Sequence, residues 1–329
     1  MRVLVTGGLG FVGLAVTRQL LARGDLVTVL SSSSRLRAPV PAGAELAVAD
    51  LRDRAALGRV IATGRFDGVC HLAALAQARD SVADPIGYFD VNVTGTLNLL
   101  HALDASSAVE PGGVDGGAAA DGRPNPPVRL VFSSTGAVYG SRDGTLDEDE
   151  PARPVNPYGA SKLAAEQVIG HQAATGRLAA VTLRCFNVAG ADGDRRDADL
   201  SRMIPKTLAV ATGQAGTLRI NGDGGAVREY THVRDVAAAV VLALDAAQAG
   251  RHRIYNVGSG LGVTLAELVT AARRITGRPI PAEHGPAQPE ARILMADSRR
   301  IRLELGWEPE HSSLEQILTD GWAAVLASG

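Results

Sequence analysis

Tyr158 and Lys162 stand four residues apart in the segment PYGASK, a spacing that can support acid–base chemistry. Pro157 opens a stretch of helical period, and residues four apart share one face of a helix. A phenol of ordinary pKa, about 10, is a poor base at neutral pH. A fixed ammonium and a nearby oxidised nicotinamide both favour the phenolate, so the pair is a candidate acid/base if a dinucleotide binds close by.

A run of three hydroxyls, Ser133 to Thr135, follows the apolar residues 129–132 and precedes the very small Gly136 and Ala137. An apolar run of this kind predicts a buried strand. Because α/β sheets hold their ligands at the carboxyl ends of their strands, we expect Thr135 to lie at a ligand site.

A glycine turn, Gly7-Gly8-Leu9-Gly10-Phe11-Val12-Gly13, separates a short apolar run from a segment of helical period. Gly7 permits a tight turn, Gly10 lets the backbone approach a pyrophosphate, and Gly13 allows close packing of helix on strand. The helix N-terminus then faces the anion. This strand–turn–helix context predicts dinucleotide binding.

The end of the second apolar run, 27–30, lacks the acidic residue that usually binds the ribose hydroxyls of NAD. Ser31 and Arg35 stand in the segment that follows, where small hydroxyls and arginines could accept the 2′-phosphate of NADP. Serines also hydrogen-bond a ribose. We therefore expect NAD as the cofactor and keep NADP as the alternative.

The composition is that of an ordinary globular chain, with 329 residues, 46% hydrophobic residues and a formal net charge of −2. Nucleic-acid binding requires a basic excess, so nucleic acid is not an expected partner. The two cysteines, Cys70 and Cys185, lie in apolar runs and favour a reducing compartment. No run reaches transmembrane length and no cleavable signal opens the chain, so we expect a cytoplasmic protein without a membrane partner. The histidines show no metal-ligand spacing, and no metal is expected.

Short runs rich in valine and leucine alternate with segments of helical period. Strands buried on both faces and joined by crossover helices give this pattern, which predicts a Rossmann-like, doubly wound parallel α/β sheet. The expected strands are 2–5, 26–30, 69–72, 129–133, 180–185 and 253–257, and the expected helices between the first of them are 12–23 and 55–61.

We expect two domains and one insertion. Residues 1–188 with about 228–258 form the expected dinucleotide-binding domain. Residues 189–227 with 259–329 form a smaller, mostly helical substrate-binding lobe. Residues 105–127 are rich in glycine, alanine, proline and aspartate and cannot bury enough apolar surface to order themselves, so we expect a mobile surface insertion there.

These motifs together resemble the extended branch of the short-chain dehydrogenase/reductase superfamily, the NAD-dependent nucleotide-sugar epimerase/dehydratase family. The similarity runs nearly from end to end and rests on TGGLGFVG, HLAAL, FSSTGAVYG, NPYGASK, LRCFNVAGA, VREYTHVRDVA, YNVGSG and LELGW. The resemblance implies a nucleotide-diphosphate sugar as the substrate, expected to be a UDP-sugar. It also implies a homodimer, formed through helices such as 91–103 and 161–172.

The resemblance assigns an expected role to each matching position. Thr135 would hydrogen-bond the reacting sugar hydroxyl, Tyr158 would be the acid/base, and Lys162 would support it. The positions implied for cofactor binding are Gly7, Gly10, Phe11, Val12, Gly13, Ser31, Arg35, Asp50, Leu51, Leu72, Ala73, Ala74, Asn92, Ser133, Tyr158 and Lys162. Those implied for substrate binding are Ser134, Thr135, Asn187, Met203 and Arg228, the last as a bidentate partner of the diphosphate.

Two small residues reduce the number of reactions that the family resemblance allows. Members of the family oxidise C4 of the sugar and then diverge, and the 4,6-dehydratases place Asp and Glu directly after the threonine. Gly136 and Ala137 stand there, and neither can move a proton. The expected reaction is therefore 4-epimerisation, by reversible C4 oxidation, rotation of the keto sugar and reduction of its other face. An NADPH-dependent 4-ketoreductase is the alternative, and a 4,6-dehydratase or a non-catalytic sugar-nucleotide sensor is disfavoured.

Three substrate-side positions depart from the pattern of the family's 4-epimerases. Ala287 stands where an arginine is usual, Leu294 where a tyrosine is frequent, and Asn221 where an aromatic side chain packs near the base. These departures leave the nucleotide base and the sugar open.

Overall fold

The structure is a computed structural model that describes residues 1–33, 38–107, 126–287 and 291–327. Arg35 and most of the expected insertion at 105–127 lie outside the described residues. The chain divides into two compact units. The first comprises 1–140, 152–184 and 240–255, and the second comprises 141–151, 185–239 and 256–329.

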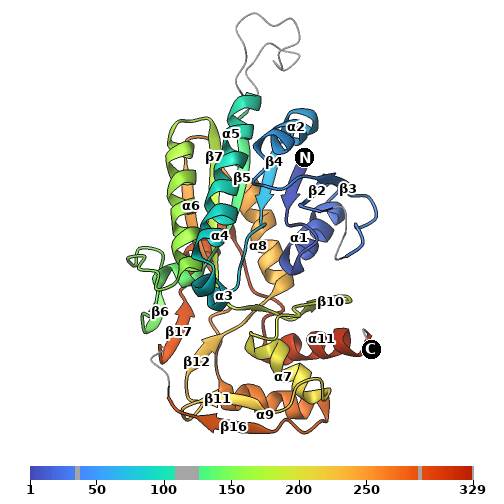
Figure 1. Ribbon diagram of the computed structural model, residues 1–329, viewed down its shortest axis with the longest axis vertical. Coiled ribbons are helices and arrows are strands. Elements are labelled where there is room, and N and C mark those ends of the chain that lie inside the picture. Colours follow the sequence, from blue (N-terminus) through green and yellow to red (C-terminus); the bar gives the residue numbers. More distant parts are fainter. Residues whose placement is uncertain (34–37, 108–125, 288–290, 328–329) are drawn as a thin grey trace, which may run out of the picture. The chain divides into compact units, whose positions relative to one another are not determined.

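The first unit is built on a seven-stranded sheet in the order β14-β7-β5-β4-β1-β2-β3 (Figure 1). Its strands are β1 (Arg2–Thr6), β2 (Leu26–Ser31), β3 (Glu45–Val48), β4 (Gly68–His71), β5 (Val128–Thr135), β7 (Leu178–Cys185) and β14 (His252–Val257). The pairings from β3 through β5 are parallel, and the order reverses between β1 and β4, as in doubly wound sheets. This confirms the predicted fold class.

The expected strands are present with ends within two residues of those predicted, and β3 is an additional edge strand. Four buried residues in a row at β4 show why these runs lack alternation, because both faces of the sheet are covered.

Helices pack on both faces of this sheet. They are α1 (Phe11–Ala22), α2 (Arg54–Gly64), α3 (Ala78–Ala83), α4 (Pro85–Phe89), α5 (Gly95–Ser107), α6 (Pro157–Ala174) and α8 (Val233–Ala246), with a π-helical turn at Asp90–Thr94 between α4 and α5. On one face, Leu57 of α2, Leu99 of α5 and Ile169 of α6 share a core with Leu130 of β5. On the other face, α1 and α8 are joined where Arg23 Nη1 meets Asp245 Oδ2 at 2.8 Å.

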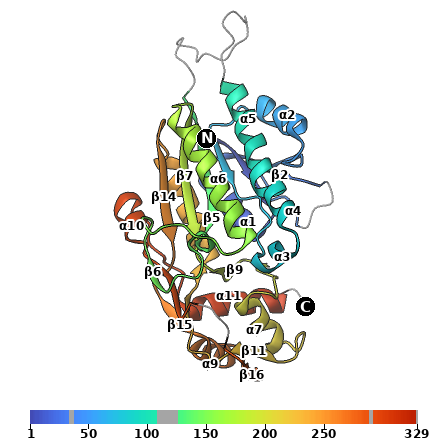
Figure 2. The same cartoon turned by 60° about the vertical axis from the view of Figure 1, so that its left-hand side comes forward.

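The second unit combines helices with short strands (Figure 2). A four-stranded sheet has the order β15 (Gly262–Thr264), β12 (Val227–Glu229), β17 (Ile293–Ala296), β6 (Gly144–Leu146). Three strand pairs accompany it: β8 (Val188–Ala189) with β13 (Thr231–His232), β9 (Ala191–Asp192) with β10 (Arg195–Arg196), and β11 (Leu218–Asn221) with β16 (Ala282–Gly285). Its helices are α7 (Met203–Ala211), α9 (Leu265–Thr276), α10 (Arg299–Leu305) and α11 (Leu314–Ala327). Leu208 of α7, Leu268 of α9 and Ile317 of α11 form its core.

The fit of α1 against the glycine turn yields a prediction about Gly13. A Cβ at this position would lie 2.1 Å from the carbonyl oxygen of Gly7, which is backbone and cannot move aside. We expect Gly13→Ala to lower the free energy of unfolding by about 3 kcal/mol, as overpacking does. Urea unfolding followed by circular dichroism measures it.

Gly58→Ala is the matched control, because Gly58 lies inside α2 and a Cβ there meets nothing within 4 Å. Alanine's better helix propensity should raise the free energy of unfolding by about 0.5–1 kcal/mol. Equal stability of Gly13→Ala and wild type would contradict the packing described for the turn.

Candidate functional site

The glycine turn has the form of an anion cradle. Gly7 adopts a φ of +69°, and a Cβ there would lie 2.8 Å from the backbone nitrogen of Ala73. Gly10 is the N-cap of α1, donates its N–H to Gly7 O at 2.9 Å, and offers no side chain to the first N–H groups of the helix. Those groups are therefore left for a ligand, and a pyrophosphate fits the donor set.

The other residues predicted to bind the cofactor near this turn lie at the start of α1 and after β4. Phe11 and Val12 form the first turn of α1 and are half-buried. Leu72 and Ala73 follow β4, and their backbone N–H groups both donate to Thr6 Oγ1 at 3.2 Å. The segment that continues through the half-buried Ala74 is thus held against the end of β1.

The end of β2 carries no acidic residue. Ser31 closes that strand, and its hydroxyl donates to the carbonyl of Ser33 at 2.8 Å. Asp50 lies after β3, and Arg52 binds its carboxylate through two guanidinium nitrogens at 3.0 and 2.8 Å, which lowers the pKa of Asp50. Leu51 is buried beside Gly95, where a Cβ would come within 2.9 Å of the leucine Cβ.

The candidate acid/base stands in the first turn of α6. Asn156 caps this helix by accepting the N–H of Gly159 at 2.9 Å, and Pro157 occupies the first helical position. One turn further, Lys162 is only 3% exposed, and its Nζ lies 4.4 Å from the centroid of the Phe132 ring. This cation–π contact holds the ammonium on the face of the helix that also carries Tyr158.

Asn92 ties α6 to the loop that follows β4. It lies in the π-helical turn, accepts the N–H of Leu75 at 2.9 Å, and donates to Leu75 O and to Ser161 Oγ, each at 3.0 Å. The Ser161 hydroxyl in turn donates to the carbonyl of Tyr158 at 2.8 Å. The predicted cofactor residue Asn92 thereby fixes the start of the helix that presents the tyrosine.

Thr135 ends β5, as its place in the hydroxyl run predicts. Its Oγ1 accepts the N–H of Ala137 at 3.1 Å and caps a 3₁₀ turn at Gly136–Tyr139. Because side chains alternate along a strand, Ser133 and Thr135 share one face and are half-buried, whereas Ser134 is 4% exposed and donates to the Glu166 carboxylate.

His71, at the end of β4, belongs to the HLAAL motif that the family resemblance places along the cofactor, and its ring joins three elements. Its Nδ1 lies 2.8 Å from Thr6 Oγ1 and its Nε2 lies 3.0 Å from Thr96 Oγ1. Thr6 Oγ1 already accepts two N–H groups and Thr96 Oγ1 donates to the carbonyl of Asn92, so the consistent tautomer carries its proton on Nε2. Burial, and next the charge of Lys162, lower the pKa of His71 to about 3, and the ring is neutral.

The predicted substrate residues Asn187, Met203 and Arg228 all lie in the second unit. Asn187 has a φ of +31° and donates through Nδ2 to the carbonyl of Glu229 at 3.0 Å. Arg228 is half-buried on β12, and Met203 opens α7. Glu229, which the sequence did not single out, is fully buried and accepts the N–H groups of Gly260 and Ala296, and burial raises its pKa.

Within residues 1–33, 38–107, 126–287 and 291–327, no three His, Cys, Asp or Glu side chains are grouped so that they could hold a metal ion. No helix in these ranges combines the length and hydropathy needed to span a bilayer.

The parallel sheet, the glycine turn at its order reversal and the Tyr158/Lys162 pair define the class of NAD(P)-dependent short-chain dehydrogenases/reductases. Within that class, the chain belongs to the NAD dependent epimerase/dehydratase family, whose model matches residues 3–258. This confirms the family that the sequence resembles.

Individual relatives match over nearly their whole length. The chain is 41% identical to the UDP-glucose 4-epimerase of Corynebacterium glutamicum, covering 100% of this chain and 97% of the relative. It is 40% identical to that of Streptomyces lividans, covering 98% and 95%. A UDP-glucose-4-epimerase structure from Stenotrophomonas maltophila, with bound NAD and formylated UDP-arabinopyranose, superposes with a TM-score of 0.86 at 31% identity, covering 99% of this chain and 98% of that one.

The buried neutral His71 yields a prediction about pH. Its pKa is about 3 in the folded protein against an ordinary 6.5, so below pH 6.5 the unfolded chain binds a proton that the folded protein does not. The neutral ring therefore makes its whole contribution to the free energy of unfolding above pH 6.5. Below pH 6.5 this contribution falls by about 1.4 kcal/mol for each pH unit. The stability advantage of wild type over His71→Asn should therefore be constant above pH 7 and shrink towards pH 5. Urea unfolding of both proteins at several pH values measures it, and an advantage that is the same at pH 5 as at pH 7.5 would contradict the neutral ring.

Proposed function

We propose that this chain is an NAD-dependent UDP-sugar 4-epimerase that interconverts UDP-glucose and UDP-galactose. The observation that carries the proposal is the arrangement around Thr135. An acid/base pair and a capping threonine stand at the carboxyl end of the sheet, and the next two positions, Gly136 and Ala137, have no side chain that moves a proton. The named relatives, UDP-glucose 4-epimerases at 40 and 41% identity over their lengths, support the same reaction.

The first unit would hold the cofactor. The pyrophosphate would lie on the glycine turn at the N-terminus of α1, Asp50 and Leu51 beside the adenine, and Ser31 at the ribose. Bound NAD supplies a hydride acceptor and donor for C4 of the sugar. NAD is preferred over NADP because the family is NAD-dependent and the neighbouring epimerase structures from Stenotrophomonas maltophila and Brucella ovis contain NAD.

Tyr158 would take the proton of the sugar C4 hydroxyl and return it after the keto sugar has turned over. Lys162 stabilises negative charge on the phenol oxygen from one helical turn away, and Thr135 orients the same hydroxyl by hydrogen bonding. Asn92, Leu72, Ala73, Ala74 and Ser133 would line the nicotinamide side. These groups suffice for epimerisation, which needs no second acid or base.

The second unit would bind the nucleotide sugar. Arg228 would pair with the diphosphate through its guanidinium fork, with Asn187 and Met203 beside it. Leu294 and Ala287 are smaller than the tyrosine and arginine of the family pattern, so we assign the diphosphate mainly to Arg228.

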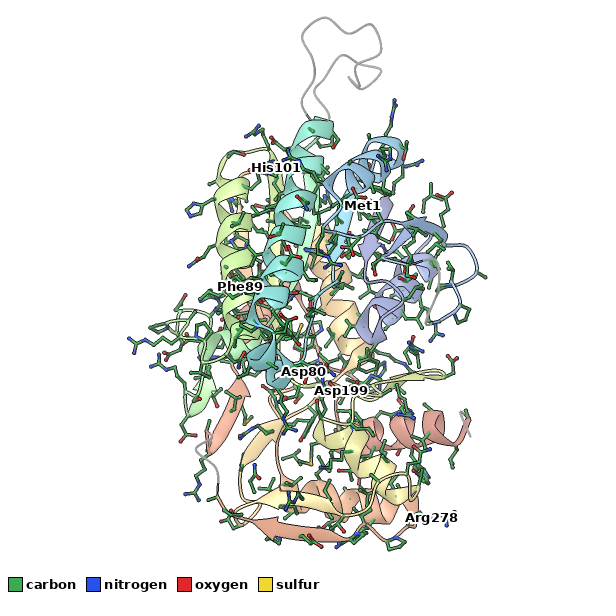
Figure 3. The ribbon with its side chains drawn as sticks, viewed as in Figure 1. Met1, Asp80, Phe89, His101, Asp199 and Arg278 are labelled. Carbon is green, nitrogen blue, oxygen red and sulfur yellow. The ribbon has the colours of Figure 1, made fainter. Side chains whose placement is uncertain are left out.

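A cytoplasmic homodimer completes the proposal. Both cysteines are free thiols, as in a reducing compartment. Val82 on α3 and Ile86 on α4 are 67% and 81% exposed. Phe89, which is labelled in Figure 3, lies at the end of α4 and is 40% exposed. Large exposed apolar side chains often mark contact surfaces. The family resemblance implies a second copy of the chain as the partner, bound through helices such as 91–103 and 161–172, and α4 ends just before the first of these in sequence.

The reaction is tested with UDP-galactose and purified protein without added cofactor. Wild type should convert it to UDP-glucose, with products separated by chromatography. Tyr158→Phe should lower kcat by about 10³-fold because the proton acceptor is lost, while UDP affinity measured by calorimetry stays unchanged. Turnover of Tyr158→Phe at the wild-type rate would contradict the acid/base role. If wild type left UDP-galactose unchanged but oxidised added NADPH stoichiometrically when given a UDP-4-keto-sugar, it would be a ketoreductase instead.

The dimer is tested by placing a charge on the exposed face of α4. Ile86→Glu should give a monomer in sedimentation velocity, because a carboxylate buried in an apolar interface is costly. Leu303→Glu is the control, since Leu303 is 86% exposed on α10 in the second unit and should leave the dimer intact. A wild-type monomer, or a dimer of Ile86→Glu, would refute the proposed interface.

A further inference from the structure

Four buried side chains of the first unit form one polar chain beside the candidate catalytic residues. Glu166 on α6 accepts a hydrogen bond from Ser134 Oγ on β5. Arg184 on β7 donates to the same carboxylate, with Nη2 2.7 Å from Oε2 and Nε 3.2 Å from each oxygen. Arg184 Nη1 then donates to the hydroxyl of Tyr139 at 2.9 Å, and its guanidinium lies 4.9 Å over the Tyr139 ring.

These four side chains are shielded from water. Tyr139, Glu166, Ser134 and Arg184 are 0, 2, 4 and 5% exposed. In such surroundings a forked arginine–carboxylate pair holds one geometry, because every displacement leaves a buried charge without its partner. The pair is therefore a rigid joint between α6, β5 and β7.

The pair makes two further, outer hydrogen bonds, with Ser134 and with Tyr139, and these two residues lie on either side of Thr135 in the sequence. Ser134 precedes Thr135 directly, and Tyr139 ends the 3₁₀ turn that Thr135 caps. Glu166 lies one helical turn beyond Lys162, on the same face of α6. The ends of the segment that presents Thr135 are thus fastened to the helix that presents Tyr158.

We propose that the Glu166–Arg184 pair is a positioning device that fixes the Thr135 hydroxyl relative to the Tyr158 phenol. The inference rests on the proposed 4-epimerase, in which both groups must reach one sugar hydroxyl. It also gives Ser134 a different role from the substrate contact that the family resemblance implies, because its hydroxyl hydrogen is directed into the scaffold towards Glu166. Small misplacements of such groups are costly, since a shift of about 1 Å can lower a rate by about 10²-fold.

The test removes each outer bond and leaves the ion pair in place. Ser134→Ala and Tyr139→Phe should each lower kcat about tenfold with KM for UDP-galactose within about twofold, because orientation changes and substrate binding does not. Thr182→Val is the matched control. Thr182 lies on the same strand as Arg184, two residues before it, and the substitution deletes the 2.8 Å hydrogen bond between Thr182 and His252. It should leave kcat unchanged. Glu166→Gln is unsuitable, since it leaves Arg184 buried without its countercharge and is expected to prevent folding.

Hydrogen exchange gives a readout that needs no substrate. The N–H of Ala137 is bound to Thr135 Oγ1, so its exchange in the NAD-loaded protein should quicken in Ser134→Ala and Tyr139→Phe and not in Thr182→Val. The proposal is overturned if both variants keep the wild-type kcat and lose only melting temperature, as Thr182→Val does. A raised KM with unchanged kcat in Ser134→Ala would also overturn it, by making Ser134 a substrate contact. If wild type fails to convert UDP-galactose, the proposed function is wrong, and unchanged exchange at Ala137 would separately refute the positioning role.

Discussion

The hydrogen bonds of His71 join the carboxyl ends of β1 and β4, and the rest of the first unit depends on this connection. At the order reversal, β1 and β4 lie side by side, and chain connections leave them towards opposite faces of the sheet. Thr6 and His71 close that gap at 2.8 Å, and Thr96 brings α5 to the same ring. A protonated ring could not accept the Thr6 hydrogen, so the neutral state is a requirement of the arrangement. The glycine turn follows the end of β1, and the segment Leu72–Ala74, predicted to line the cofactor, follows the end of β4, so these two strand ends position both.

The candidate catalytic groups are positioned by polar contacts between elements that are distant in sequence. Asn92 connects the loop after β4 with the helix of Tyr158, and Glu166 connects this helix with the strand of Thr135. The Asn92–Ser161 and Ser134–Glu166 contacts are buried, and the Asn92–Leu75 contact is partly buried and made with backbone. The sheet thus brings the candidate catalytic groups to one edge, and a few side-chain hydrogen bonds fix the distances between the elements that carry them.

The sequence was sufficient for the parts that local chemistry determines. The glycine turn, the strands of the large sheet other than β3 and the Tyr158/Lys162 face follow from residue type and spacing. The comparisons confirm the family and its NAD dependence. The short strands of the second unit did not follow, since β8 and β13 have two residues each and too few for any periodicity. The Glu166–Arg184 pair is formed by tertiary packing and leaves no local signal. Only the alternation of side chains along a strand could have indicated that Ser134 faces the opposite side of the sheet from Ser133 and Thr135.

Several ionisable groups are buried near the candidate acid/base Tyr158, and their charges nearly balance. Lys162 is buried against the Phe132 ring, the His71 ring is neutral, and Glu166 and Arg184 form a buried ion pair. The neutral ring and the ion pair therefore add little net charge beside Lys162, which shares a helix face with Tyr158. A neutral ion pair can fasten the Thr135 segment rigidly without changing this balance, whereas a lone carboxylate in the place of Glu166 would compete with the phenolate for the lysine. Rigid positioning and an undisturbed acid/base are compatible because the joint carries no net charge.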